Sequence, residues 1–144
     1  MVTTVTDEQS AARELVRDWA RKLGTDAVRE TEQGNPDAWR PLFAGVAELG
    51  LFGIPFPEEY DGMGADYFAH CLVLEELAKV DQSVAITLEA GVSLGAMPVY
   101  LFGTEDQKQH WLPRLARGEA LGAFGLTEPG GGSDARGTRS RAVH

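Results

Sequence analysis

The first half of the chain repeats apolar side chains at the spacing of amphipathic helices. Over residues 7–23 the repeat runs in three- and four-residue steps, and Thr6 with Gln9 forms a T-x-x-Q capping box at its start. A second repeat covers residues 37–49 and is ended by Gly50. These two patterns predict two helices, each with one apolar face.

A proline-rich stretch separates these patterns from the next one. Pro55 and Pro57 prevent regular structure across residues 55–64, so we expect an ordered loop there. Helical spacing resumes near Ala65 and continues to a polar break at which Asp81 can cap the following helix. The pattern therefore predicts a third helix and the start of a fourth.

The segment from residue 83 to residue 102 is apolar on every face of a helix, which predicts a helix that is buried on all sides. Gly91, Gly95 and Pro98 lie inside it and lower helix stability, by about 1 kcal/mol for each glycine and about 3 kcal/mol for proline. Such residues are expected where a neighbouring helix or a ligand approaches the backbone closely, and the sequence alone leaves both explanations open.

A further helix and then a change of pattern follow. Thr104 with Gln107 forms a second capping box, for a helix that reaches about Leu115. Residues 121–127 are apolar and partly alternating, which is typical of a β-strand, and Pro129 with three glycines ends the strand. The predicted fold class is all-α, with about five helices followed by the first strand and loop of a β-domain.

Composition and charge narrow the possible functions. Apolar residues make up 43% and charged residues 24% of the 144 residues, as in globular proteins, and the net charge of -9 repels nucleic acid and anionic membranes. Cys71 is the single cysteine, so no intrachain disulfide forms, and its apolar neighbours predict a core position. No run approaches the roughly 20 apolar residues of a membrane span, and no secretory signal is evident. We expect a cytoplasmic protein without nucleic-acid or membrane partners.

The glycine-rich loop of residues 127–134 is the strongest candidate for chemistry. Consecutive glycines let backbone N–H groups converge on an anion, and Ser133 adds a hydroxyl donor, so phosphate or pyrophosphate is the expected ligand. A plain exposed turn explains the glycines equally well. Residues 130–135 also match G-x-G-x-x-A, but no helical pattern or acidic residue follows at the distance that a Rossmann site requires.

The histidines offer no second candidate. His70, His110 and His144 stand apart from one another, without metal-ligand spacing or a partner carboxylate pattern. We therefore predict no metal site and no covalent nucleophile, and we expect His110 at the surface or at a helix end.

Four segments, in this order, resemble the acyl-CoA dehydrogenase family. The glycine-rich segment Phe-Gly-Leu-Thr-Glu-Pro-Gly-Gly-Gly-Ser-Asp is similar to the family's signature loop. The other three resemble its early proline loop, its substrate-side helix and the helix that follows. The four segments are residues 53–64, 93–98, 102–113 and 124–134.

The resemblance implies a subunit of three parts: an N-terminal helical domain, a middle β-domain and a C-terminal four-helix domain. Residues 1–118 would form the helical domain, and residues 119–144 the start of the β-domain with its flavin-contacting loop. By position, Phe124, Leu126 and Thr127 would line the isoalloxazine of FAD, and Gly132 and Ser133 would lie near its phosphates.

The same resemblance implies an acyl-CoA substrate and a reaction. Thr87, Ala90, Gly91 and Leu94 would line the acyl end of the pocket, and Ser133 would be reachable from the acyl-CoA. The family removes an α-proton and passes a β-hydride to flavin N5, which yields the trans-2-enoyl thioester.

No residue of this chain corresponds to the glutamate that serves the family as catalytic base, so we predict no catalytic residue, and we expect Glu128 to be structural. Electron-transfer flavoprotein would be the electron acceptor, and a homo-oligomer or a completing subunit is expected. The alternative is a truncated, non-catalytic helical module or one subunit of a split enzyme.

Overall fold

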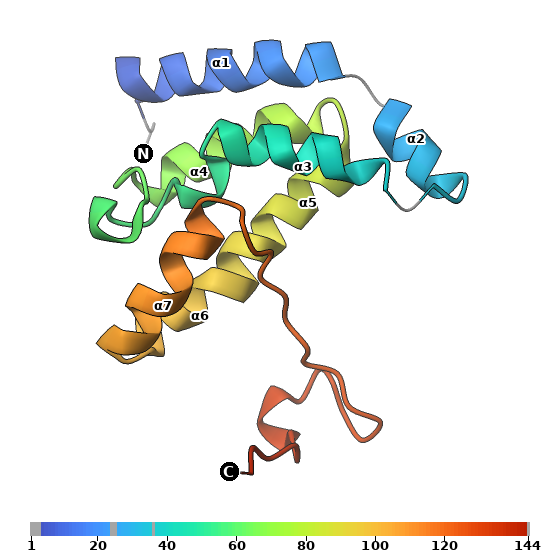
Figure 1. Cartoon of the computed structure of the whole chain (residues 1–144), viewed down its shortest axis with the longest axis vertical. Coiled ribbons are helices and arrows are strands. Elements are labelled where there is room, and N and C mark those ends of the chain that lie inside the picture. Colours follow the sequence, from blue (N-terminus) through green and yellow to red (C-terminus); the bar gives the residue numbers. More distant parts are fainter. Residues whose placement is uncertain (1–3, 24–25, 36, 144) are drawn as a thin grey trace.

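The structure is a computed structural model, and it describes residues 4–23, 26–35 and 37–143. Within these ranges the regular elements are helical (Figure 1). The α-helices are α1 (Asp7–Leu23), α2 (Asp26–Glu32), α3 (Trp39–Glu48), α4 (Tyr67–Ala78), α5 (Gln82–Glu89), α6 (Met97–Phe102) and α7 (Glu105–Ala116). The other helical turns are η1 (Leu51–Gly53), η2 (Glu58–Tyr60), the π-helical η3 (Ala90–Ala96) and η4 (Ala135–Gly137).

The polar residues that begin the helices do so by the expected hydrogen bonds. At the start of α1, Thr6 and Gln9 exchange both bonds of a capping box, and Thr104 and Gln107 do the same at the start of α7. The Asp81 carboxylate accepts the backbone N–H groups of Ser83 and Val84 at the start of α5. These three predicted caps are confirmed, because each satisfies N–H groups that have no partner inside the helix.

α5, η3 and α6 follow one another without a break and form a single rod from residue 82 to residue 102 (Figure 1). With this rod counted as one helix, the described chain has six helices, and five of them were predicted. The missing one is α2, whose seven residues are too few for an apolar repeat to be recognised.

The rod is not buried on all sides, and this prediction is wrong. Val84, Leu88, Val92 and Ala96 lie in the core, where α4, η1 and α7 pack against the rod. Ile86 and Leu101, by contrast, are 62% and 58% exposed, and Leu94 and Phe102 are exposed with them. An apolar composition all round a helix does not show which faces neighbouring elements cover.

The rod is long and apolar enough to cross a membrane by length and composition, with 21 residues and a mean hydropathy of 1.5. This corrects the expectation that no apolar run approaches that length. Core helices of soluble proteins pass the same test, and the rod packs against α4 and α7 and carries Glu89 at its middle.

The proline loop is ordered, as predicted, and it closes one end of the core. Phe56 is fully buried, and its carbonyl accepts the Gly64 N–H at 2.8 Å. Gly62 passes so close to the Phe56 carbonyl that a Cβ at this position would collide with backbone atoms. The loop therefore holds its shape through backbone contacts that a larger residue at position 62 would break.

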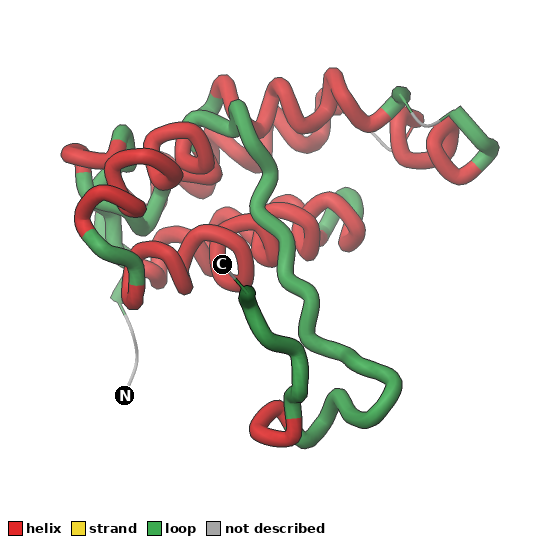
Figure 2. Tube along the Cα trace, turned by 60° about the horizontal axis from the view of Figure 1, so that its bottom comes forward, coloured by secondary structure: helices red, strands yellow, loops and turns green. Residues whose placement is uncertain are grey.

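After α7 the chain leaves the helices as a long extended segment with a turn near its end (Figure 2). Residues 121–127 are not a β-strand, which corrects the sequence prediction, although their backbone is extended. A strand needs a neighbouring strand for its hydrogen bonds, and the described part of the chain offers it none. The one β-bridge found there joins Glu128 to Gly131 within the turn.

Candidate functional site

The extended segment lies against the glycines of the rod. A Cβ built on Gly95 would lie 2.5 Å from the Cα atom of Gly122, and a Cβ on Gly91 would lie 3.3 Å from Leu121 Cδ1. The two rod glycines therefore make room for residues 121–122 of the same chain. Phe52 of η1 also packs on Gly91, because a Cβ there would lie 3.4 Å from its ring.

Beyond this contact the predicted flavin-side residues project into open space. Phe124 and Leu126 are 54% and 37% exposed, although both are apolar. Thr127 lies beside Gly132, because a Cβ on Gly132 would be 3.2 Å from Thr127 Oγ1. The turn thus brings together Thr127 and Gly132, two of the residues that the resemblance assigns to the flavin.

The turn is shaped by its own backbone and by Glu128. The N–H groups of Glu128 and Gly131 each donate to the other residue's carbonyl, at 2.9 and 3.1 Å. The Glu128 carboxylate accepts the backbone N–H groups of Ser140 and Arg139 at 2.8 and 2.9 Å. Hydrogen bonds from Ser140 and Arg139 hold the pKa of Glu128 below its ordinary value. The predicted structural role of Glu128 is confirmed.

The residues of the turn fit a dinucleotide with its phosphates. A Cβ on Gly130 would meet nothing within 4 Å, so its backbone is open to a ligand. The hydroxyls of Thr127 and Ser133 have no hydrogen-bond partner among the described residues, and both side chains are exposed. Free donors on a glycine-rich backbone are what an anionic group or the polar edge of a flavin requires. The Gly131 N–H is already used within the turn, so it is not one of these donors.

The predicted substrate-side residues lie on the rod next to the extended segment. Thr87 lines a cavity, and its hydroxyl donates to the Ser83 carbonyl at 2.8 Å. Ala90 is half-buried, Gly91 is buried beneath Leu121, and Leu94 is 47% exposed. Ser133, the fifth predicted residue, lies on the distant turn and makes no hydrogen bond to the rod within the described ranges. The structure therefore groups four of the five.

A polar cluster that sequence reasoning missed lies between α4 and the rod. His70 is fully buried, and its Nε2 lies 2.9 Å from a carboxylate oxygen of Glu89. Tyr67 and Ser93 also donate to Glu89, and Tyr67 contacts Ser93. His70 therefore has the carboxylate partner that its sequence neighbourhood did not reveal, because the two residues are 19 positions apart.

The pKa shifts in this cluster have opposing causes. Burial lowers the pKa of His70, and the nearby Glu89 opposes that shift without cancelling it. Burial raises the pKa of Glu89, but hydrogen bonds from Ser93, His70 and Tyr67 outweigh burial and leave the pKa below its ordinary value. The cluster therefore favours a neutral His70 beside an ionised Glu89.

Other carboxylates of the helices have structural partners. Glu76 is 2% exposed and binds Arg13 at 2.5 Å, Arg17 at 3.1 Å and Lys79 at 2.9 Å. The hydrogen bond from Arg17 is the largest of several causes that hold the pKa of Glu76 far below its ordinary value. No group of three His, Cys, Asp or Glu side chains that could hold a metal ion was found within the described residues.

Cys71 and His110 both lie at the surface of the helical part. Cys71 is exposed, so the prediction of a core cysteine is wrong, since its neighbours in the chain face other sides of α4. His110 is exposed on α7 beside Trp111, as predicted.

Residues 6–119 match the sequence profile of the acyl-CoA dehydrogenase N-terminal domain, which covers most of the chain. The chain belongs to the acyl-CoA dehydrogenase family. The resemblance drawn from four short segments is thereby confirmed across the whole helical part.

Relatives of this acyl-CoA dehydrogenase domain match it along nearly its full length. A probable acyl-CoA dehydrogenase of Bacillus subtilis is 48% identical over 139 residues, which are 96% of this chain and 36% of the relative. The short-chain-specific acyl-CoA dehydrogenase of Megasphaera elsdenii is 42% identical over 143 residues, 96% of this chain and 37% of the relative. The chain thus spans little more than a third of the length of these relatives.

Solved structures confirm the fold of the domain. Butyryl-CoA dehydrogenase from Megasphaera elsdenii superposes with a TM-score of 0.83 at 40% identity, over 96% of this chain and 37% of that one. An acyl-CoA dehydrogenase from Bacillus anthracis, solved in complex with FAD, has a TM-score of 0.85 at 38% identity, over 92% of this chain and 22% of that one. A chain from work on the electron transferring flavoprotein of Acidaminococcus fermentans has a TM-score of 0.85 at 44% identity, over 96% of this chain and 36% of that one.

Proposed function

We propose that this chain supplies the helical domain and the first flavin-contacting loop of an FAD-dependent acyl-CoA dehydrogenase. The reaction of such an enzyme removes two hydrogens from an acyl-CoA thioester and yields the trans-2-enoyl thioester. The observation that carries the proposal is the placement of the glycine-rich turn. The rod glycines seat residues 121–122, and the turn that follows presents hydroxyl donors that the chain itself does not use.

FAD, when bound, supplies the acceptor for the β-hydride. In our proposal Phe124 and Leu126 cover the isoalloxazine, and the Thr127 hydroxyl donates to its polar edge. Gly132 and Ser133 lie near the phosphates, which the glycine backbone can approach closely. Arg136, Arg139 and Arg141 follow the turn and add positive charge on that side. Exposed Phe124 and Leu126 lose water contact when a flat ring covers them, which favours binding.

We assign no catalytic residue to this chain. Two carboxylates, Glu128 in the turn and Glu89 beside Ala90 on the rod, are engaged by other groups: Glu128 by the backbone of residues 139 and 140, and Glu89 by His70, Tyr67 and Ser93. The α-proton therefore passes to a group in the part of the enzyme that corresponds to the remaining two thirds of its relatives. We refer to the assembly that contains this part as the completed enzyme.

Two partners belong to the proposal. One relative is named a subunit of a caffeyl-CoA reductase–Etf complex, and it is 35% identical over 138 residues. That name supports an electron-transfer flavoprotein as acceptor here. We also propose a cytoplasmic homo-oligomer, or a complex with a completing subunit, in which a second polypeptide covers the exposed side of the rod.

The exposed apolar side chains also support a second candidate: a helical module that acts as one subunit of a split enzyme. Leu94, Leu101, Phe102 and Phe124 are all about half exposed or more. A group of exposed apolar side chains of this kind marks an interaction surface. A separate polypeptide that carries the β-domain and the C-terminal helices would favour this candidate.

Flavin retention tests the proposal. After gel filtration with excess FAD, these 144 residues alone should lose the visible flavin absorbance, because they supply only part of the walls of the proposed site. The completed enzyme should retain FAD in stoichiometric amount, and an acyl-CoA should bleach it anaerobically. A Thr127→Val variant of the completed enzyme should bind FAD more weakly, because the hydroxyl donor is removed at nearly constant volume. A completed enzyme that folds and retains no flavin would contradict the proposal.

A further inference from the structure

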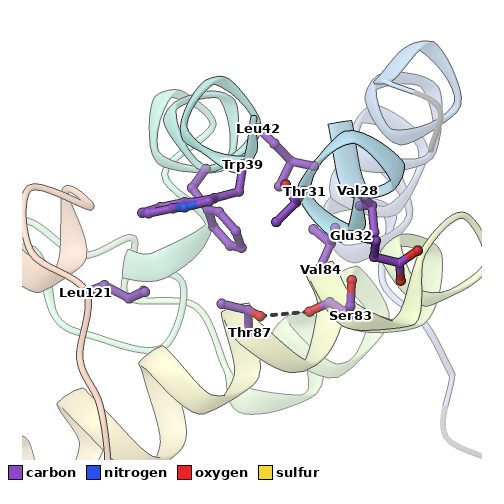
Figure 3. A pocket seen from close by; sticks show the side chains of 10 residues that line it. Val28, Thr31, Glu32, Trp39, Leu42, Ser83, Val84, Thr87 and Leu121 are labelled. Atoms are coloured by element: carbon purple, nitrogen blue, oxygen red, sulfur yellow. Dashed lines mark hydrogen bonds between the residues drawn. The ribbon is translucent and has the colours of Figure 1, made fainter. Parts of the chain in front are cut away.

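A cavity of about 410 Å³ lies between α2, α3 and the rod (Figure 3). Its volume falls in the range of small-molecule binding sites. In Figure 3 the side chains of α3 lie above it, those of α5 lie below it, and Leu121 closes one side. The residues that line it are Val28, Thr31, Glu32, Trp39, Leu42, Phe43, Ser83, Val84, Thr87 and Leu121.

The lining selects an apolar, uncharged occupant. Six of the ten residues are apolar. Among them, the rings of Trp39 and Phe43 pack edge to face, with their centroids 5.5 Å apart. Glu32 is the one charged residue among the ten and carries a negative charge, so the lining repels phosphate or carboxylate. The Thr87 hydroxyl is engaged by the Ser83 carbonyl, so it is not a free donor in the cavity.

The cavity continues the row of predicted substrate-side residues. Ser83 and Thr87 are one helical turn apart, and Ala90 and Gly91 follow at the next turn on the same side of the rod. Leu121 belongs to both regions, because it lines the cavity and its Cδ1 lies 3.3 Å from a Cβ built on Gly91. The Leu121 side chain therefore stands between the cavity and Gly91, and a chain that runs along the rod into the cavity has to displace it.

We infer that this cavity receives the distal end of the acyl chain, so that the substrate class is an acyl-CoA with a long, unbranched chain. This inference rests on the proposed function. The rod from Leu94 to Ser83 measures roughly 16 Å at the rise of a helix. A butyryl group is far too short for that span, whereas an extended dodecanoyl group covers most of it. Seating an apolar tail against Trp39 and Leu42 removes apolar surface from water and stabilises the complex.

All ten lining residues belong to this chain, so the cavity can be tested with the chain as it is. Trp39 is one of three tryptophans, and the other two, Trp19 and Trp111, do not line this cavity. A bromine atom at the end of an acyl chain quenches tryptophan fluorescence on contact. We expect ω-bromododecanoyl-CoA to quench a saturable part of the emission, and ω-bromobutyryl-CoA at the same concentration to leave it unchanged. The quenching should disappear in Trp39→Phe, which nearly preserves the shape of the cavity wall.

Two variants one residue apart form the matched control. Thr87→Phe places a ring inside the cavity, whereas Ile86→Phe places the same ring on the exposed side of the rod, where Ile86 is 62% exposed. We expect Thr87→Phe to lower the affinity for ω-bromododecanoyl-CoA by a factor of about ten or more, and Ile86→Phe to retain wild-type affinity. Far-ultraviolet circular dichroism on each variant shows whether the helices remain folded. If Thr87→Phe unfolds, the milder Val84→Ile provides the same test.

The possible failures are distinguishable. Equal quenching by both chain lengths, no quenching at all, or full quenching in Thr87→Phe would overturn the inference and leave the proposed function standing. In the completed enzyme, ω-bromododecanoyl-CoA that bleaches the flavin without quenching Trp39 would have the same meaning. If no acyl-CoA of any length bleaches the flavin of the completed enzyme, the proposed function fails, whatever the cavity binds.

Discussion

The backbones of Gly95 and Gly122 are in direct contact, and neither position has space for a side chain. A Cβ on Gly95 would lie 2.5 Å from Gly122 Cα, and a Cβ on Gly122 would lie 2.7 Å from Gly95 Cα. The contact joins the middle of the rod to the segment that leads to the glycine-rich turn. It is therefore the point at which the helical domain sets the position of the proposed flavin loop.

Substitution of Gly95 by alanine tests this contact through the sign of its effect. In an isolated helix alanine is more stable than glycine by about 1 kcal/mol. Here we expect Gly95→Ala to destabilise the chain by about 1 to 3 kcal/mol, because the added methyl group overlaps backbone atoms that cannot rotate away. Urea denaturation measures the difference. Gly125→Ala is the control, since a Cβ there meets nothing within 4 Å. A more stable Gly95→Ala variant would show that the segment is not held against the rod.

The ion-pair cluster around Glu76 should stabilise the packing of α1 on α4. Replacing Glu76 by glutamine removes the buried charge that three partly exposed cations share, and we expect a loss of about 2 kcal/mol in the free energy of unfolding from the lost charged hydrogen bonds. Glu75→Gln is the matched control: Glu75 is the neighbouring residue, 53% exposed, and its ion pairs with Arg13 and Lys79 are solvated. A similar loss for both variants would mean that burial of Glu76 has no special effect.

The buried His70 predicts a fall in stability on mild acidification. Burial lowers the pKa of His70 in the folded chain, so below its ordinary value near 6.5 the unfolded chain binds more protons. The free energy of unfolding should therefore fall as pH decreases from about 7.5 through 6.5, until His70 is protonated in the folded chain as well. Thermal unfolding across this range measures the slope.

Two glutamine variants show which histidine causes this change of stability with pH. His70→Gln keeps a polar side chain beside Glu89 but removes the titrating ring, and it should flatten the pH dependence. His110→Gln changes an exposed histidine and should leave the dependence as in the wild-type chain. A slope that survives in His70→Gln would assign the effect to another group.

The Asp81 cap is the simplest test of helix initiation in the rod. Its carboxylate accepts the Ser83 N–H at 2.8 Å and the Val84 N–H at 3.3 Å. Asp81→Ala should reduce stability by about 1 kcal/mol, whereas Asp81→Asn should retain most of the cap. Chemical denaturation of the two variants side by side distinguishes loss of the hydrogen bonds from loss of the charge.

The sequence predicted the parts of the fold that depend on local chemistry. Capping boxes at Thr6 and Thr104 and the aspartate cap at residue 81 are formed by neighbours within three positions, so their sequence pattern is sufficient. The proline loop was expected to be ordered because its prolines restrict the backbone. α2 escaped prediction because seven residues are too few for a recognisable repeat.

Features that depend on distant residues were not predictable in this way. His70 and Glu89 meet because α4 and the rod pack together, and neither residue's neighbours indicate it. The exposed faces at Ile86 and Leu101 follow from which neighbours cover the rod. Residues 121–127 have the composition of a strand, but pairing depends on a partner strand. For the site, the sequence singled out the turn and the glycines, and the structure adds that the glycines seat residues 121–122 and that Thr87 borders a cavity.

The π-helical turn from Ala90 to Ala96 makes this stretch of the rod unusually tolerant of a change in length. A π turn closes its hydrogen bonds over five residues where an α turn uses four, so it holds one residue more than a regular helix would. Deleting a single residue there would return the stretch to regular α-helical hydrogen bonding and leave Leu101 and the start of α7 facing nearly the same directions. A deletion in the regular α-helix α5 has no extra residue to remove, so it would turn everything beyond it by about 100°. The same one-residue deletion should consequently be far more damaging in α5 than in the π-helical turn.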